Sequence, residues 1–69
     1  MYDYNICMKS GKEYKITTKF TIDELIDKIM PKSMNEFRFS NFSLAGNEEN
    51  IAGILGNEIS SIEFVVKVG

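Results

Sequence analysis

Very few side chains in this 69-residue sequence could carry out catalysis. It contains no histidine, which removes the commonest general base, the nucleophile–histidine pairs and nearly all zinc sites. The one cysteine, Cys7, has no histidine to activate it, and we expect an inert thiol. The stretch Ser10–Lys12 lacks the rest of a phosphate-binding loop, which needs a glycine in place of Ile6 and a hydroxyl residue in place of Glu13. We therefore expect no enzymatic activity and no cofactor.

Acidic side chains occur in two groups that could hold a cation. Asp23 and Asp27 are four residues apart beside Glu24, and Glu48–Glu49 lie in a polar stretch. However, acids in a first helical turn also complement the helix dipole, and no calcium-loop spacing is present. We interpret both groups as solvated surface and expect no metal site.

Lysines are concentrated in the first 20 residues. This part holds four lysines and two acids, a net charge of +2, whereas the rest holds four cations and eight acids, a net charge of −4. We expect three of the lysines on the outward face of a hairpin and one at its tip. Such a group can bind phosphates or an acidic protein surface, or can simply protect a sheet edge. The candidate binding residues are Lys9, Lys12, Lys15 and Lys19.

Three phenylalanines, Phe37, Phe39 and Phe42, surround Arg38. Exposed aromatic rings beside a cation can stack on nucleic-acid bases. The glycine that follows the basic residue in the usual RNA-binding motif is missing here. Because a small domain needs large side chains for its core, we expect these rings to be buried.

One helix is predicted, over residues 22–30. Thr21 is a favourable N-cap, and Glu24 three residues later completes a capping box. Pro31 disfavours a helical conformation at the preceding residue and should end the helix. The apolar residues repeat with helical spacing and should face the core; they are Ile22, Leu25, Ile26, Ile29 and Met30.

A hairpin precedes the helix. Residues 1–9 and 14–20 alternate between apolar and polar side chains, which is typical of half-buried strands. A three-residue loop with Gly11 in the left-handed conformation would pair Ile6 with Tyr14 and keep both apolar sets on one face. A two-residue loop would put the two sets on opposite faces, so we predict the longer loop.

Two further strands are predicted after the helix, over residues 36–44 and 51–55. In the first, the alternation breaks at Ser40–Asn41, which indicates either a bulge or the end of the strand. The polar stretch Gly46–Asn50 should be an exposed turn. In the second strand, Gly53 is expected to be a weak or bulged point.

The last predicted strand covers residues 59–69. Ile62, Phe64, Val66 and Val68 should share one face, with Val65 among the polar residues opposite. Both faces of the strand are then apolar near its middle, so either curling of the sheet into a barrel or a second subunit must cover Val65. We expect self-association as a two-fold dimer through Val65 and Val68.

The order of elements is therefore β-β-α-β-β-β, and residues 1–69 should form one complete α+β domain. Hairpin-length connections predict an antiparallel sheet with the helix on one face. The alternative is a more strongly curled sheet, an SH3-like or Sm-like small barrel.

Two segments carry a resemblance to known proteins. Met8–Tyr14 and Ile59–Glu63 resemble segments of small uncharacterised proteins from phages and mobile elements of low-GC Gram-positive bacteria. The high proportion of lysine, isoleucine and asparagine is also similar to products of AT-rich genomes. The resemblance implies no particular functional residue.

These observations favour a small, non-enzymatic protein-interaction module, in keeping with a phage or prophage accessory factor that binds a host protein. The alternative is a small nucleic-acid-binding barrel that uses the hairpin lysines, but the net charge of −2 makes nucleic acid the less favoured partner. A single cysteine fits a reducing compartment, and no apolar run approaches the roughly 18 residues of a membrane span. We expect a cytoplasmic protein without membrane contact.

Overall fold

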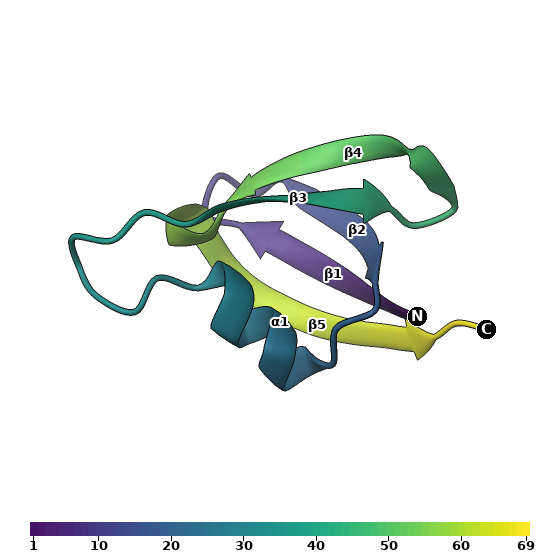
Figure 1. Cartoon of the computed structure of the whole chain (residues 1–69). Coiled ribbons are helices and arrows are strands. Elements are labelled where there is room, and N and C mark those ends of the chain that lie inside the picture. The colour runs from purple at the N-terminus through teal and green to yellow at the C-terminus, as the bar shows by residue number, and fades with distance from the viewer.

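The computed structural model describes residues 1–69 and contains one α-helix and one five-stranded antiparallel sheet (Figure 1). The elements are β1 (Tyr2–Met8), β2 (Glu13–Thr18), α1 (Ile22–Ile29), β3 (Phe39–Leu44), β4 (Asn47–Leu55), the 3₁₀ turn η1 (Gly56–Glu58) and β5 (Ile59–Lys67). This content agrees with the predicted α+β class. The strand order is β4-β3-β2-β1-β5, and no pairing joins the edge strands β4 and β5. The sheet is therefore open, which favours the open-sheet prediction over a closed barrel.

The hairpin of β1 and β2 has the predicted register. Ile6 pairs with Tyr14, and Gly11 has a φ of +93° in a three-residue loop. The Met8 N–H donates to the Lys12 carbonyl at 2.8 Å, and the Gly11 N–H donates to the Met8 carbonyl at 2.9 Å. The loop length and the apolar pattern select the same register, which confirms the prediction.

The helix α1 begins at the predicted cap. The Thr21 hydroxyl accepts from the Glu24 N–H at 3.4 Å, and the Glu24 carboxylate accepts from the Thr21 N–H at 3.0 Å. Met30, before Pro31, is extended, so α1 ends at Ile29 and is one residue shorter than predicted. The expected apolar stripe is only partly in the core. Leu25 and Ile29 are buried, but Ile26 is 43% exposed because it lies at the side of α1 rather than beneath it.

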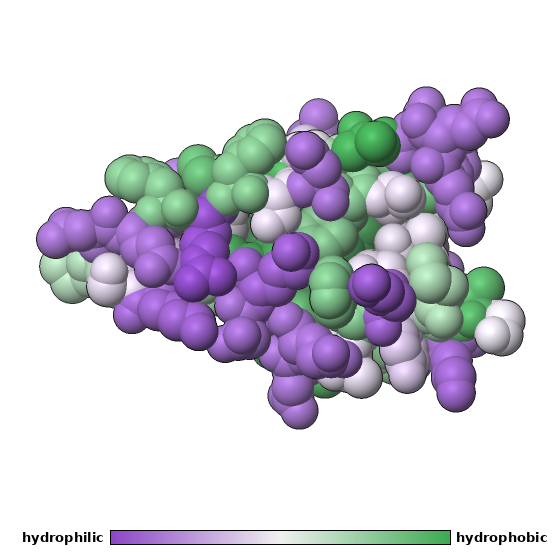
Figure 2. Space-filling model, in the orientation of Figure 1, coloured by the Kyte–Doolittle hydropathy of each residue, from purple (hydrophilic) through white to green (hydrophobic).

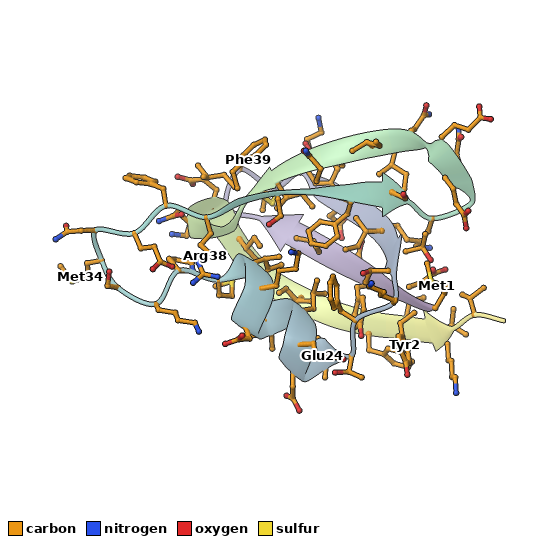
Figure 3. The ribbon with its side chains drawn as sticks, in the orientation of Figure 1. Met1, Tyr2, Glu24, Met34, Arg38 and Phe39 are labelled. Atoms are coloured by element: carbon orange, nitrogen blue, oxygen red, sulfur yellow. The ribbon has the colours of Figure 1, made fainter.

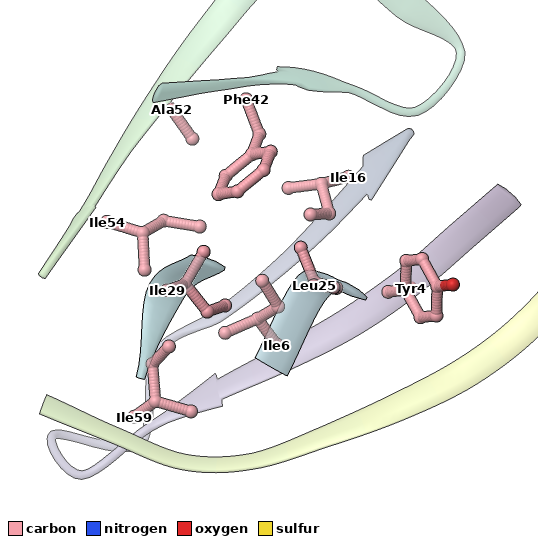
Figure 4. Close-up of a cluster of buried hydrophobic side chains, with 9 residues drawn as sticks. All are labelled: Tyr4, Ile6, Ile16, Leu25, Ile29, Phe42, Ala52, Ile54 and Ile59. Atoms are coloured by element: carbon pink, nitrogen blue, oxygen red, sulfur yellow. The ribbon is translucent and has the colours of Figure 1, made fainter. Parts of the chain in front are cut away.

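The core lies between α1 and the sheet (Figure 4). It consists of Tyr4, Ile6, Ile16, Leu25, Ile29, Phe42, Ala52, Ile54 and Ile59. The one polar group that this cluster contributes is satisfied, because the Tyr4 hydroxyl donates to the Phe20 carbonyl at 2.7 Å. Burial raises the pKa of Tyr4, so this hydroxyl keeps its proton and stays a donor.

The hairpin of β3 and β4 corrects two predictions. From Phe39 to Ser43 the pairing with β4 is regular, so there is neither a bulge nor a strand end at Ser40–Asn41. Phe39 and Phe42 are three residues apart on a regular strand and therefore face opposite sides of the sheet. Phe42 is in the core, whereas Phe39 is 67% exposed. Its ring lies over Gly53, where an added Cβ would stand 2.6 Å from the ring, so Gly53 makes room for the ring instead of marking a bulge.

The predicted turn at Gly46–Asn50 is also wrong. The turn is the pair Ala45–Gly46, with Gly46 at a φ of +80°, and β4 already begins at Asn47. Leu44 pairs with Asn47 and Ser43 with Ile51, so residues 48–50 are extra residues in β4. The polar composition of these residues is typical of a turn, but here they form the irregular start of an edge strand.

The end of α1 is tied to the segments around it. An added Cβ on Gly56 would lie 1.7 Å from the Ile29 carbonyl oxygen, so only glycine allows this approach of η1 to α1. Arg38 donates to the carbonyls of Asp27 and Lys28 at 3.3 and 3.1 Å, and Figure 3 shows it reaching from the loop towards α1. A guanidinium at the negative end of a helix satisfies carbonyls that have no partner within the helix. These contacts fix α1 relative to β5.

Candidate functional site

A shallow apolar groove lies between α1 and the first half of β5. Its volume is about 220 Å³. Ile26 and Met30 line it from the helix side, and Ile59, Ser60, Ser61 and Ile62 line it from β5. Ile59 is buried, Met30 and Ile62 are half-buried, and Ile26 is exposed. The Ile26 side chain that we expected in the core thus forms an open wall of the groove.

The strand beside this groove has a free edge. β5 pairs only with β1, so its other side carries backbone N–H and C=O groups that no strand of this chain uses. The pairing is regular from Ser61 to Phe64 and shifts on either side, where Ser60 and Val65 are extra residues. Bulges of this kind limit edge-to-edge pairing. The regular, available edge is therefore a short segment that adjoins the groove.

The shift at Val65 corrects the predicted faces of β5. Phe64 pairs with Tyr4, Val66 with Asp3 and Lys67 with Tyr2. Val66 therefore lies on the face opposite Phe64, where Lys67 had been expected. The apolar run Phe64–Val66 arises because one extra residue, Val65, is inserted into β5. Three apolar residues in succession therefore do not require that both faces of the sheet be covered at this point.

The candidate self-association residues lie at the end of the molecule where the chain begins and ends. Val65 is 44% exposed and Val68 is 40% exposed. The Val68 N–H donates to the Met1 carbonyl at 2.8 Å, which extends the pairing beyond β5. The exposed apolar residues here are Met1, Phe64, Val65, Val66 and Val68; we call them the terminal patch.

The four candidate lysines are exposed but do not converge. Lys12 and Lys19 flank β2 at opposite ends, and a six-residue strand is about 20 Å long. The Lys12 ammonium lies 5.1 Å from the Tyr14 ring centre, and the Lys19 ammonium lies 5.8 Å from that of Phe20. Lys15 projects from the outer face opposite Asn5, and Lys9 stands in the hairpin loop. They form a scattered basic surface with no common pocket.

Two aromatic residues are more exposed than predicted. Phe37 and Phe39 are 76% and 67% exposed, so the expectation that all three phenylalanines belong to the core is wrong for these two. Figure 2 shows apolar side chains gathered over the start of β3. Arg38 between them is engaged with α1 and with Glu36. The break in alternation after Phe39 was the signal that these rings and Phe42 face opposite ways.

The segments that line the groove are acidic. Residues 22–30 and 58–63 carry five acids and one lysine, a net charge of −4. Hydrophilic side chains cover the exposed side of α1 in Figure 2. Asp27 forms an ion pair with Lys32 at 2.9 Å, which lowers its pKa. Asp23, Glu58 and Glu63 have no ion-pair partner, whereas Lys32 and Arg38 lie at the end of α1 and offset part of its negative charge.

A small polar cluster lies on the outer face of the first hairpin. Asn5 donates to the Glu13 carboxylate at 2.9 Å, and the Cys7 thiol donates to the same oxygen at 3.4 Å. These bonds lower the pKa of Glu13, with the Asn5 bond as the larger cause. The base beside the thiol is the Glu13 carboxylate, which its lowered pKa makes a weak one, and the chain has no histidine.

No group of three or more histidine, cysteine or acidic side chains is arranged to hold a metal ion. The helix α1 has eight residues, far fewer than the roughly 20 that a membrane-spanning helix needs.

The groove was missed at the level of sequence because its shape depends on where α1 sits relative to β5. Two features of the sequence could have indicated the groove. The apolar stripe of the helix is wider than so short a helix can bury, and two serines lie at the start of the last strand. Comparisons with protein-family models, with curated proteins and with solved structures find no match to this chain.

Proposed function

We propose that this chain is a small, non-enzymatic protein-binding module that takes up an extended segment of another protein at the free edge of β5. The observation that carries the proposal is the position of the apolar groove beside the regular edge segment Ser61–Phe64. In strand addition, backbone hydrogen bonds along a sheet edge supply affinity, and a pocket for every second side chain supplies specificity. Here the edge and the pocket adjoin.

The edge segment is long enough for such a contact. Every second residue of an edge strand directs both its N–H and its C=O outwards, so four regular residues offer about four backbone hydrogen bonds to an added strand. The two bulges end the segment on each side, which suits a short peptide better than a long one. The resemblance to phage and mobile-element proteins supports a host protein as the partner, met in the cytoplasm.

The proposal is tested with a random peptide library displayed on phage and selected against the immobilised full chain. Selected peptides are then added to the ¹⁵N-labelled protein, and amide hydrogen exchange is followed by NMR. We expect new protection for amides within Ser61–Phe64 and shifts at Ile26 and Met30. Failure to select any peptide, or protection confined to β4 or to the first hairpin, would refute the proposal.

A second candidate function is nucleic-acid binding, and the observation in its favour is the exposure of Phe37 and Phe39. Single-stranded bases stack on exposed aromatic rings, and the hairpin lysines would neutralise phosphates. The charge of the chain opposes this function. Fluorescence anisotropy with labelled single-stranded and duplex oligonucleotides tests it: salt-sensitive micromolar binding that Phe39→Ala weakens would support it.

A further inference from the structure

The groove has the size of a side chain, not of a cofactor. Ligand pockets for small molecules typically measure about 300–1,000 Å³, whereas this groove measures about 220 Å³ and is shallow. Its walls are mainly apolar, with Ile26 and Met30 on the helix side and Ile59 and Ile62 on β5, where Ser60 and Ser61 add two hydroxyls. One bulky apolar side chain would fit within it and contact these residues.

The two faces of the edge segment differ in chemistry. Ile62 pairs with the buried Ile6 and lies on the inner face beside the groove, whereas Glu63 pairs with Asn5 and lies on the outer face. A strand added to this edge would alternate in the same way. Its inward residue would meet the groove, and the neighbours of that residue would meet Glu63 on the outer face. Directly opposed charges of unlike sign stabilise such cross-strand pairs.

Resting on the proposed function, we propose that the bound segment is basic: an extended peptide in which a bulky apolar residue is flanked on both sides by lysine or arginine. The apolar residue occupies the groove on the inner face, and the flanking cations lie on the outer face against Glu63. The Glu63 carboxylate on the outer face, together with the longer-range field of the acidic residues of α1, favours this partner over an acidic or neutral segment.

The same charges disfavour two other occupants. A nucleic acid would bring phosphates to a negatively charged surface. A second copy of β5 paired along this edge would place two Glu63 side chains on one face, and residues 58–63 contain no cation to separate them. Neither a nucleic acid nor a second copy of β5 would both fill the apolar groove and complement the negative charge beside it.

The test is fluorescence anisotropy with three labelled peptides, each with a central leucine, threonine at the ends, and lysine, glutamine or glutamate on both sides of the leucine. We expect the lysine peptide to bind about ten-fold more tightly than the glutamate peptide at low ionic strength, with the glutamine peptide between them. The difference should shrink as added salt screens the charges.

Matched variants separate the contribution of the apolar groove from that of the Glu63 charge. Ile26→Ser should weaken all three peptides about ten-fold, whereas Ile51→Ser, at an exposed isoleucine of β4, should leave them unchanged. Glu63→Lys should abolish the preference for lysine, whereas Glu48→Lys, an identical charge change in β4, should preserve it. Circular dichroism and urea midpoints establish that each variant is folded.

The outcomes distinguish this inference from the proposed function. Equal binding of the three peptides, or equal effects of Glu63→Lys and Glu48→Lys, would overturn the basic preference and leave strand addition standing. Selection of acidic peptides from the displayed library would do the same. Displacement of the glutamine peptide by an oligonucleotide would overturn the inference in favour of nucleic acid.

Discussion

Gly56 marks the close approach of the C-terminal end of α1 to the turn that leads into β5. The Ile29 carbonyl occupies the space that a side chain at this position would need. The Gly56 N–H also donates to the Arg38 carbonyl at 2.7 Å, so the backbone is held from two sides. A single glycine therefore controls the separation of the two walls of the groove.

Replacement of this glycine gives the first prediction. Gly56→Ala should lower the free energy of unfolding by about 2 kcal/mol or more, because either α1 or η1 must move. Gly53→Ala is the matched control, since its Cβ would meet only the exposed side chains of Phe39 and Asn41, which can turn aside. We expect that control to change stability by less than about 1 kcal/mol. Similar urea midpoints for both variants would show that the approach at Gly56 is not restrictive.

Capping of α1 gives the second prediction. Thr21→Ala removes the hydroxyl that accepts from the Glu24 N–H and should cost about 1 kcal/mol. Thr21→Ser keeps the hydroxyl and should retain most of the stability. Urea denaturation followed by circular dichroism measures both. An alanine variant as stable as the serine variant would contradict a role for the cap.

At the scale of elements, the loop between α1 and β3 is held by a chain of polar contacts. The Glu36 carboxylate accepts from the Lys32 N–H at 3.2 Å and binds the Arg38 side chain, and Asn57 donates to the Glu36 carbonyl at 2.7 Å. Arg38 in turn satisfies the last carbonyls of α1. A loop without regular structure thereby joins the helix to η1 and keeps the groove in shape.

These contacts give the protein a predictable response to acid. The Arg38 side chain lowers the pKa of Glu36, and the Thr21 N–H lowers the pKa of Glu24, each from an ordinary value of 4.5. The folded form therefore binds protons less readily than the unfolded form. Stability is full above the unfolded value and falls as the pH drops through 4.5 and below it.

Urea midpoints at about pH 7 and about pH 3 measure this third prediction. Glu24→Gln should reduce the loss on acidification, because glutamine can still complete a capping box but does not titrate in this range. Glu48→Gln is the control, since Glu48 makes no ion pair. A loss that is the same in all three proteins would show that Glu24 does not contribute.

The elements show where sequence patterns suffice and where they do not. The hairpin register and the helix start follow from contacts between near neighbours, such as Ile6 with Tyr14 and Thr21 with Glu24, and both were predictable. The orientation of Phe39 and the exposure of Ile26 depend on how distant segments pack. The extra residue at Val65 is visible only once its partner strand is known. The groove combines several such distant relations, so no local pattern indicates it.

At the scale of the whole molecule, apolar surface is concentrated at the two ends of the sheet. The terminal patch lies at one end, and the exposed rings of Phe37 and Phe39 lie over the start of β3. The molecule is elongated, with extents of 37 × 22 × 18 Å. Phe64 belongs both to the terminal patch and to the edge segment Ser61–Phe64, so a second copy on the patch would adjoin the groove.

Self-association through this patch is the fourth prediction. The five residues of the patch are apolar, so a two-fold contact would oppose apolar side chains to one another. Sedimentation equilibrium at micromolar concentrations should give a mass above that of the 7.9 kDa chain. Val65→Lys should lower this mass, whereas Lys15→Glu on the outer face of β2 should not. A mass that stays at 7.9 kDa at the highest concentration would exclude the dimer.

The bond between the Val68 N–H and the Met1 carbonyl brings the two ends of the chain together. A short glycine-serine linker could join them, and the polypeptide could be reopened at the exposed Met34 as a circular permutant. In that permutant, α1 and β3 would belong to opposite ends of the new chain. The core contacts of Leu25 and Ile29, together with those of Arg38 and Gly56, would then have to hold the helix beside β5. A cooperative unfolding transition of the permutant would show that tertiary contacts, not continuity of the chain between α1 and β3, set the width of the groove.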